Sequence, residues 1–172
     1  MERASSKTLR MASLCPMIPL PGLSISEDIV FTSDIQVACT AKDILLFAVP
    51  SVFVRSTAAL AAAFIPDGQI IVDVAKGIEP DTLLTMTEVI RDELSKDGGH
   101  DHIKLVALSG PTHAEEVALD MPTAIVSACT DMEVAEVVQD TFMDTCMRTY
   151  TNADVLGVEL CGAMKNIVAL AA

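Results

Sequence analysis

The sequence has no Trp, and Phe and Tyr bring its aromatic content to only 3% of 172 residues. A core built almost without aromatic rings must be aliphatic, and hydrophobic residues make up 51% of the chain. So hydrophobic a composition excludes a disordered tail. It favours a buried parallel sheet covered by helices, because such strands are rich in Val, Ile and Leu.

Positive charge is also scarce. Lys and Arg number 11 against 24 Asp and Glu, so the formal net charge is -13. No basic stripe is present, and we predict no nucleic-acid partner because phosphate binding needs clustered Lys and Arg. No apolar run approaches the roughly 18 residues of a membrane span. We therefore predict a cytoplasmic protein without a membrane span.

Cysteine spacing gives no sign of a disulfide framework or a metal site. The five Cys residues stand at positions 15, 39, 129, 146 and 161 and form no paired CxxC motif. Free thiols in a reducing cytosol are the expected state. His100 and His102 belong either to a metal site or to a polar loop. No cluster of further ligands accompanies them, so we predict a loop and no metal.

Apolar runs alternate with helical patterns along most of the chain. Short apolar runs flanked by Pro or Gly predict buried strands at residues 44–49, 70–74, 103–108, 123–128 and 147–151. Helices are predicted at residues 34–41, 51–64, 80–94, 131–143 and 152–172, with Ser51 as an N-cap. This alternation predicts an α/β fold with a partial Rossmann-like, doubly wound, mostly parallel sheet.

The predicted organisation has three parts. Residues 1–26 form an irregular segment: basic residues precede a mildly apolar stretch, as in a signal or transit peptide, but Pro residues interrupt it. Residues 27–151 form a partial dinucleotide-binding domain, and residues 152–172 begin a helical domain. The Gly-x-Gly-x-x-Gly motif that normally follows the first strand of such a sheet is absent from this sequence.

Three segments follow predicted strands, at the edge where open α/β sheets bind ligands. They are residues 49–53, 75–77 and 109–116. Lys76 is either a ligand-binding lysine or a solvated loop residue. Gly110 and Pro111 predict a tight turn, and Thr112 is expected to cap the next helix. Free N–H groups at that helix start either bind an anion or only need a cap.

The last predicted helix carries Lys165 on a face of small residues. At helical spacing that face includes Gly157, Cys161, Gly162 and Ala169. Small residues let a ligand or another backbone approach closely. A lysine held there among apolar neighbours is a usable general acid or base. The alternative is a tightly packed helix pair whose lysine reaches out to solvent.

Together, several of these segments resemble bacterial-type NAD(P)-dependent glycerol-3-phosphate dehydrogenase. They are Val49-Pro50-Ser51, Ala75-Lys76-Gly77-Ile78-Glu79, Ser109-Gly110-Pro111-Thr112-His113-Ala114-Glu115-Glu116, Pro122-Thr123-Ala124 and Gly162-Ala163-Met164-Lys165-Asn166. Their order and intervals also fit. The resemblance covers residues 27–172 and implies the family's central portion, without its glycine loop and its C-terminal helical domain. Ala75 departs from the family pattern, which usually has Thr there.

The resemblance implies reduction of dihydroxyacetone phosphate to sn-glycerol 3-phosphate with NADH or NADPH, for glycerophospholipid synthesis. Lys165 would be the catalytic proton donor or acceptor at the carbonyl oxygen. The substrate would be bound by Lys76, Gly110, Thr112 and Lys165. The NAD or NADP cofactor would be contacted by Phe53, Lys76 and Ala114. The parent enzyme is expected to be a homodimer.

Two alternatives stay open. A β-hydroxyacid dehydrogenase also combines a Rossmann sheet with a catalytic Lys, but it usually has Asn four residues after that Lys, where this chain has Ala169. A non-catalytic interaction module, such as a truncated paralogue that pairs with a full subunit, would explain the absent glycine motif.

Overall fold

The computed structural model describes residues 28–143 and 145–171, so the expectations for residues 1–26 lie outside it. Its elements in chain order are α1 (Ile35–Cys39), β1 (Ile44–Phe47), the 3-10 helix η1 (Ser51–Phe53), α2 (Val54–Ala61), the 3-10 helix η2 (Ala62–Phe64), β2 (Ile70–Asp73), α3 (Met86–Leu94), β3 (Lys104–Ser109), α4 (Ala114–Ala118), β4 (Thr123–Ala128), α5 (Met132–Met143), β5 (Met147–Asn152) and α6 (Val155–Ala171).

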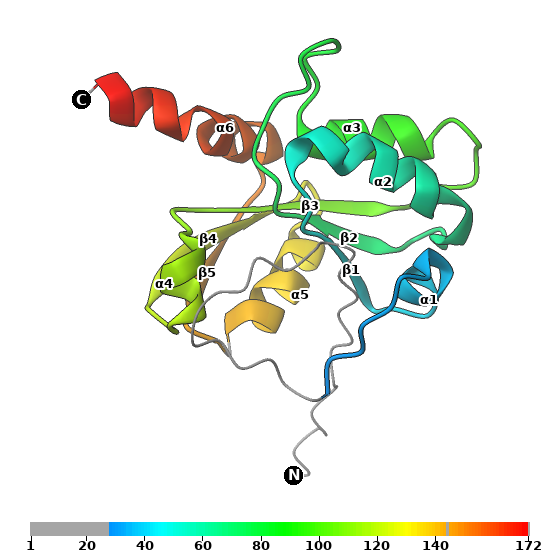
Figure 1. Ribbon diagram of the computed structural model, residues 1–172, viewed down its shortest axis with the longest axis horizontal. Helices are drawn as coiled ribbons and strands as arrows, with labels where there is room; N and C mark the ends of the chain where they lie inside the picture. Colours follow the sequence, from blue (N-terminus) through cyan, green and yellow to red (C-terminus); the bar gives the residue numbers. More distant parts are fainter. Residues whose placement is uncertain (1–27, 144, 172) are drawn as a thin grey trace.

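The strands form one five-stranded sheet in the order β1-β2-β3-β4-β5 (Figure 1). Strands β1, β2 and β3 run parallel, β4 is antiparallel to β3, and β5 is parallel to β4. The antiparallel pair arises because the link through α4 returns to the sheet at the end where β3 stops. The predicted α/β, mostly parallel sheet is confirmed.

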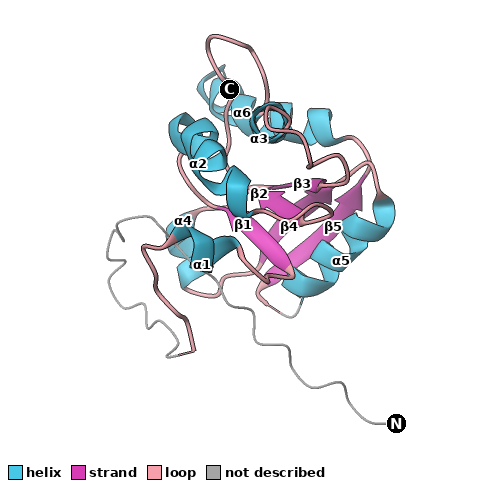
Figure 2. Ribbon diagram, turned by 90° about the vertical axis from the view of Figure 1, so that its right-hand side faces the viewer, coloured by secondary structure: helices cyan, strands magenta, loops and turns pink. Residues whose placement is uncertain are grey.

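Helices cover both faces of this sheet, as expected of a doubly wound fold. Figure 1 and Figure 2 show α2 and α3 on one face and α5 on the other. Side-chain alternation sends Leu45, Ile71 and Leu105 into the core under α2 and α3. It sends Val72 and Val106 into a second core under α5. Both cores are aliphatic, as the composition requires.

Helix α3 begins later than the sequence pattern indicated. It starts at Met86 and not at the predicted residue 80, because Thr85 and Glu88 form a capping box at that point. The backbone N–H of Thr85 donates to the Glu88 carboxylate at 2.9 Å. The Thr-x-x-Glu pattern of a capping box stands in the sequence and would have placed this helix start correctly.

The predicted helix over residues 51–64 is divided into η1, α2 and η2. Ser51 was expected to cap it, and this is wrong, because no side-chain cap bond is made at the start of η1 or α2. The Ser51 side chain instead lies against Gly77, where an added Cβ atom would come within 2.9 Å of the Ser51 Cβ. The loops after β1 and β2 are therefore in direct contact.

The described Cys residues are free, and His100 and His102 bond within loops. Cys39, Cys129, Cys146 and Cys161 are free thiols. Both ring nitrogens of His100 lie 3.1 Å from backbone carbonyl oxygens, those of Leu94 and Ile65, and His102 pairs with Asp67. Within residues 28–143 and 145–171, no three His, Cys, Asp or Glu side chains gather as a metal site would need, and no helix is long and apolar enough to cross a membrane.

Candidate active site

The loop that follows β2 contacts the loops that follow β1 and β3, and helix α6 lies against it at Gly162. Gly77 lies against Ser51, which joins the first loop to the second. Lys76 bonds to Thr112, which joins the second loop to the third. All three loops follow the carboxyl ends of parallel strands, where open α/β sheets bind ligands.

Lys76 is half-buried at the centre of this group. Its Nζ donates a hydrogen bond to the hydroxyl oxygen of Thr112 at 2.8 Å. Burial lowers the pKa of Lys76, and the positive charge of Lys165 lowers this pKa further. The Lys76 side chain is therefore not simply solvated, and its role in binding a ligand stays a prediction.

The turn before α4 uses Thr112 differently from the prediction. The residue that caps α4 is His113, without a side-chain bond, because the helix begins at Ala114, and the Thr112 hydroxyl accepts a bond from Lys76. The Thr112 N–H donates to the Gly110 carbonyl at 2.8 Å, which makes the predicted tight turn. A Cβ atom at Gly110 would lie 2.5 Å from the Ala124 carbonyl oxygen, so only glycine fits there.

Helix α6 brings Lys165 to the same edge, although not in the expected surroundings. A Cβ atom added at Gly162 would lie 2.7 Å from the Ser109 Oγ and 3.6 Å from the Lys76 Cγ, so this helix approaches the loops closely. Lys165 lies one turn further and its side chain is exposed. The prediction that Lys165 is held among apolar neighbours is therefore wrong, because α6 is largely exposed beyond Gly162.

The small-residue face predicted around Lys165 is not uniform. Gly162 makes the close contact that the pattern indicated. Gly157 instead leaves room for Asp154, whose carboxylate accepts the Gly157 N–H at 2.9 Å at the start of α6. Cys161 and Ala169 are exposed. One helix position, and not the whole face, therefore controls how closely α6 approaches the sheet.

The two predicted cofactor contacts outside the lysine pair lie on adjoining segments. Phe53 ends η1 two residues after Ser51, and its side chain is 56% exposed. Ala114 begins α4 two residues after Thr112 and is also exposed. Both residues thus stand next to the loops that contact the Lys76 loop, with their side chains open to solvent.

Two buried acids near this site were missed by the sequence analysis. Asp73 ends β2 and is only 2% exposed, and among the described residues neither of its carboxylate oxygens has a hydrogen-bond partner of normal geometry. Burial raises its pKa to about 8; the Ala75 N–H opposes this rise, and the charge of Glu159 adds to it. Both acids interrupt apolar segments of the sequence, Asp73 in β2 and Glu159 in α6, and that was the available signal.

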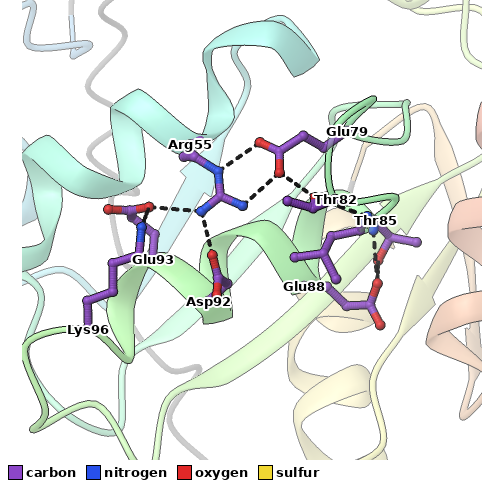
Figure 3. Close-up of polar contacts among 9 residues, drawn as sticks. Arg55, Glu79, Thr82, Thr85, Glu88, Asp92, Glu93 and Lys96 are labelled. Atoms are coloured by element: carbon purple, nitrogen blue, oxygen red, sulfur yellow. Dashed lines mark hydrogen bonds and ion pairs between the residues drawn. The ribbon is translucent and has the colours of Figure 1, made fainter.

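A second network, also missed, fixes the loop that carries Lys76. Figure 3 shows the guanidinium of Arg55 between acids of that loop and of α3. Its Nε and one terminal nitrogen each donate to Glu79 at 2.7 Å, and the other terminal nitrogen donates to Asp92 and Glu93. Hydrogen bonding to Arg55 lowers the pKa of Glu79 to about 2. The network ties α2 and α3 to residue 79, three positions after Lys76.

Comparison with known proteins gives this geometry a context. The profile of the family described as "NAD-dependent glycerol-3-phosphate dehydrogenase N-terminus" matches residues 17–135. That match begins ten residues before the region in which we saw the resemblance. The glycerol-3-phosphate dehydrogenase [NAD(P)+] 2 of Lactobacillus delbrueckii subsp. bulgaricus is 71% identical over 152 residues, which are 88% of this chain and 45% of the relative.

A second sequence relative and a crystal structure point to the same family. The glycerol-3-phosphate dehydrogenase [NAD(P)+] of Bacillus subtilis is 44% identical over 153 residues, 89% of this chain and 44% of that protein. The crystal structure of the Coxiella burnetii glycerol-3-phosphate dehydrogenase superposes with a TM-score of 0.77 at 28% identity, covering 88% of this chain and 45% of that one. This chain thus spans less than half of each relative's length, and it belongs to the NAD-dependent glycerol-3-phosphate dehydrogenase family.

Proposed function

We propose that the protein reduces dihydroxyacetone phosphate to sn-glycerol 3-phosphate with NADH or NADPH, and that this chain carries part of the active site. The observation that supports this most directly is the lysine pair. Lys76 donates a hydrogen bond to Thr112 at the ligand edge of a Rossmann-like sheet, and the positive charge of Lys165 lowers its pKa. Two cations at one edge suit a phosphorylated substrate in an otherwise acidic chain.

The residues present fit a nicotinamide dinucleotide. Val52 and Phe53 expose 79% and 56% of their side chains just after β1, which offers an apolar surface to a flat ring. Phe53, Lys76 and Ala114 are the residues that we assign to this contact. When bound, the nicotinamide supplies the hydride.

The chain's own residues supply orientation, a proton and positive charge. The ammonium of Lys165 donates the proton to the carbonyl oxygen as negative charge develops there. Lys76 and Thr112 hold the substrate, with the Lys76 charge directed at its phosphate. Gly110 is assigned to the substrate site as well, and its missing side chain lets this turn lie directly against Ala124 and Ile125 of β4.

We extend the proposal to the parent protein. Residues 27–151 would form part of the dinucleotide-binding domain, and residues 152–172 would begin a helical substrate domain. The exposure of α6 beyond Gly162 supports this division, because an apolar helix normally packs against a neighbour. The parent would be a cytoplasmic homodimer whose product enters glycerophospholipid synthesis.

A chimera tests the reaction. This chain would replace the matching segment of the Lactobacillus delbrueckii enzyme, and NADH or NADPH oxidation would be followed with dihydroxyacetone phosphate. We expect turnover, and a loss of kcat of about 100-fold or more in Lys165→Met. Lys104→Met, at the far end of β3, is the matched control and should stay active. A Lys165→Met chimera as fast as the unmodified one would disprove the assigned role.

The alternative of a non-catalytic interaction module would explain the absent glycine motif, and one feature of the structure also fits it. Ile167, Val168 and Leu170 expose apolar side chains on α6. A pull-down of the 172-residue chain against an intact dehydrogenase subunit would give a stoichiometric complex under this alternative. The family match gives no support to the β-hydroxyacid dehydrogenase hypothesis.

A further inference from the structure

A buried acid, Glu159, joins α6 to the start of α3. Its carboxylate accepts the backbone N–H of Thr87 at 2.9 Å, the hydroxyl of Thr87 at 2.6 Å and the hydroxyl of Thr85 at 2.8 Å. All three residues are buried. Because an unmade hydrogen bond is costly in a buried place, these contacts hold the two helices in one arrangement.

The start of α3 is a favourable place for this carboxylate. The first N–H groups of a helix have no partner inside the helix, and the helix dipole is positive at that end. The Thr85 N–H is satisfied by Glu88 within α3. The Thr87 N–H is satisfied by Glu159 from α6. An acid from a distant part of the chain thus completes the cap of α3.

Helix α6 has a second contact one turn later and is exposed after it. Gly162 lies against Ser109 and Lys76. Lys165 follows, and the apolar side chains beyond Gly162 are exposed to solvent. Figure 1 shows this end of α6 extending away from the sheet. The contacts at Glu159 and Gly162 therefore set the direction in which α6 presents Lys165.

We propose that Glu159 is a positioning residue for Lys165, acting through helix α6 and not by touching the substrate. This inference rests on the proposed role of Lys165. Six residues separate the two positions, which is about 9 Å along a helix axis. The Glu159 side chain is also buried and already bonded to Thr85 and Thr87.

The charged and titratable groups around Glu159 agree with a positioning role. Asp73 is buried on the same face of β2 as α3 and α6, Glu88 shares the Thr85 hydroxyl, and Lys76 lies on the loop after β2. The raised pKa of Asp73 makes this acid largely neutral at neutral pH. Glu159 can then stay on the start of α3 without like-charge repulsion from Asp73.

Amide hydrogen exchange of the 172-residue chain tests whether the Glu159 hydrogen bonds hold α6 against α3. In Glu159→Gln we expect exchange of the α6 amides to quicken about tenfold or more, since hydrogen bonds to a charged group are lost. Amides of β2 and β3 should keep their protection. The matched control is Asp154→Asn, another acid-to-amide change, directly before α6, which keeps a side chain able to cap the helix. Unchanged protection of α6 in Glu159→Gln would overturn the proposal.

Kinetics of the chimera separate positioning from other roles. We expect Glu159→Gln to lower kcat about tenfold and to leave the KM for NADH within about twofold. Thr87→Val, which removes one of the three donors, should change exchange and kcat in the same direction but less. A lower kcat with unchanged exchange would also overturn positioning. If the unmodified chimera were inactive, the proposed function would fail, while hydrogen exchange would still test whether Glu159 holds α6 in place.

Discussion

The network around Glu159 and the network around Arg55 hold elements that carry the two site lysines, yet they are built in opposite ways. The first is buried and consists of the Glu159 carboxylate and the Thr donors around it. The second lies near the surface, where the Arg55 side chain is 28% exposed and faces three carboxylates. Water and salt screen the second network but hardly reach the first. We therefore expect each residue of the buried network to matter more.

Among these substitutions, Asp73→Asn should change the free energy of unfolding most, and the size of this change should depend on pH. Burial raises the pKa of Asp73 to about 8, from roughly 3.9 when unfolded. The folded chain therefore holds an extra proton between these values. Binding of this proton stabilises the folded chain. The stabilisation is fully present below the pKa of Asp73 in the unfolded chain, and it is lost as pH rises through the pKa of Asp73 in the folded chain.

Urea unfolding of wild type and Asp73→Asn across this pH window gives the measurement. We expect the free energy of unfolding of the wild type, relative to the variant, to fall with rising pH by at most about 1.4 kcal/mol per pH unit. A difference that stays constant from about pH 4 to about pH 8 would mean that Asp73 is ionised in the folded chain.

Thr87→Val should give the next largest effect. The change keeps the side-chain shape but removes a buried donor 2.6 Å from the Glu159 carboxylate. We expect the free energy of unfolding to fall by about 1.5–3 kcal/mol, measured by urea titration. Thr141→Val is the matched control, because the Thr141 hydroxyl bonds only to a carbonyl near the surface of α5. Equal losses in both variants would remove the distinction that we draw for the buried network.

Arg55→Gln should cost less and should depend on salt. The Arg55 guanidinium bonds to Glu79, Asp92 and Glu93, but solvent screens all of these pairs. We expect a loss of about 1 kcal/mol at low salt that shrinks as salt is added. Arg91→Gln, at an exposed position of α3, is the control. A loss larger than that of Thr87→Val would reverse the ranking of the two networks.

Lys165→Met should give the smallest effect, with no measurable change in stability, because the Lys165 side chain is exposed. Its readout is the titration of Lys76 followed by NMR of the side chain. Removing the Lys165 charge should raise the pKa of Lys76 toward its ordinary value, and burial should keep this pKa lowered in part. An unchanged Lys76 titration would place the two lysines too far apart to share one substrate.

The sequence predicted the fold class and most elements because strand signals are local. Each predicted strand was found within two residues of its bounds, since apolar runs between Pro and Gly leave few alternatives. The predicted start of α3 was wrong, although the capping-box pattern of Thr85 and Glu88 stands in the sequence. Pro at the first position of a helix is common and predicted the start at Pro80, but this Pro stands in a turn.

At the site, the sequence identified Lys76, Thr112 and Lys165 but assigned some of their surroundings wrongly. Thr112 was expected to cap a helix and instead bonds to Lys76, which lies 36 positions away. Lys165 was expected among apolar neighbours and is exposed. A helical wheel shows which residues share a face, but it does not show what that face meets.

The sequence by itself therefore determined the aliphatic core, the alternation of strands and helices, and the loops where chemistry gathers, because these depend on neighbours along the chain. Only the tertiary structure decided which distant groups meet. It placed Glu159 on the start of α3, Arg55 beside Glu79, and the Asp73 carboxylate in a buried position. Such contacts depend on how helices lie across a sheet, and local propensity carries no information about that arrangement.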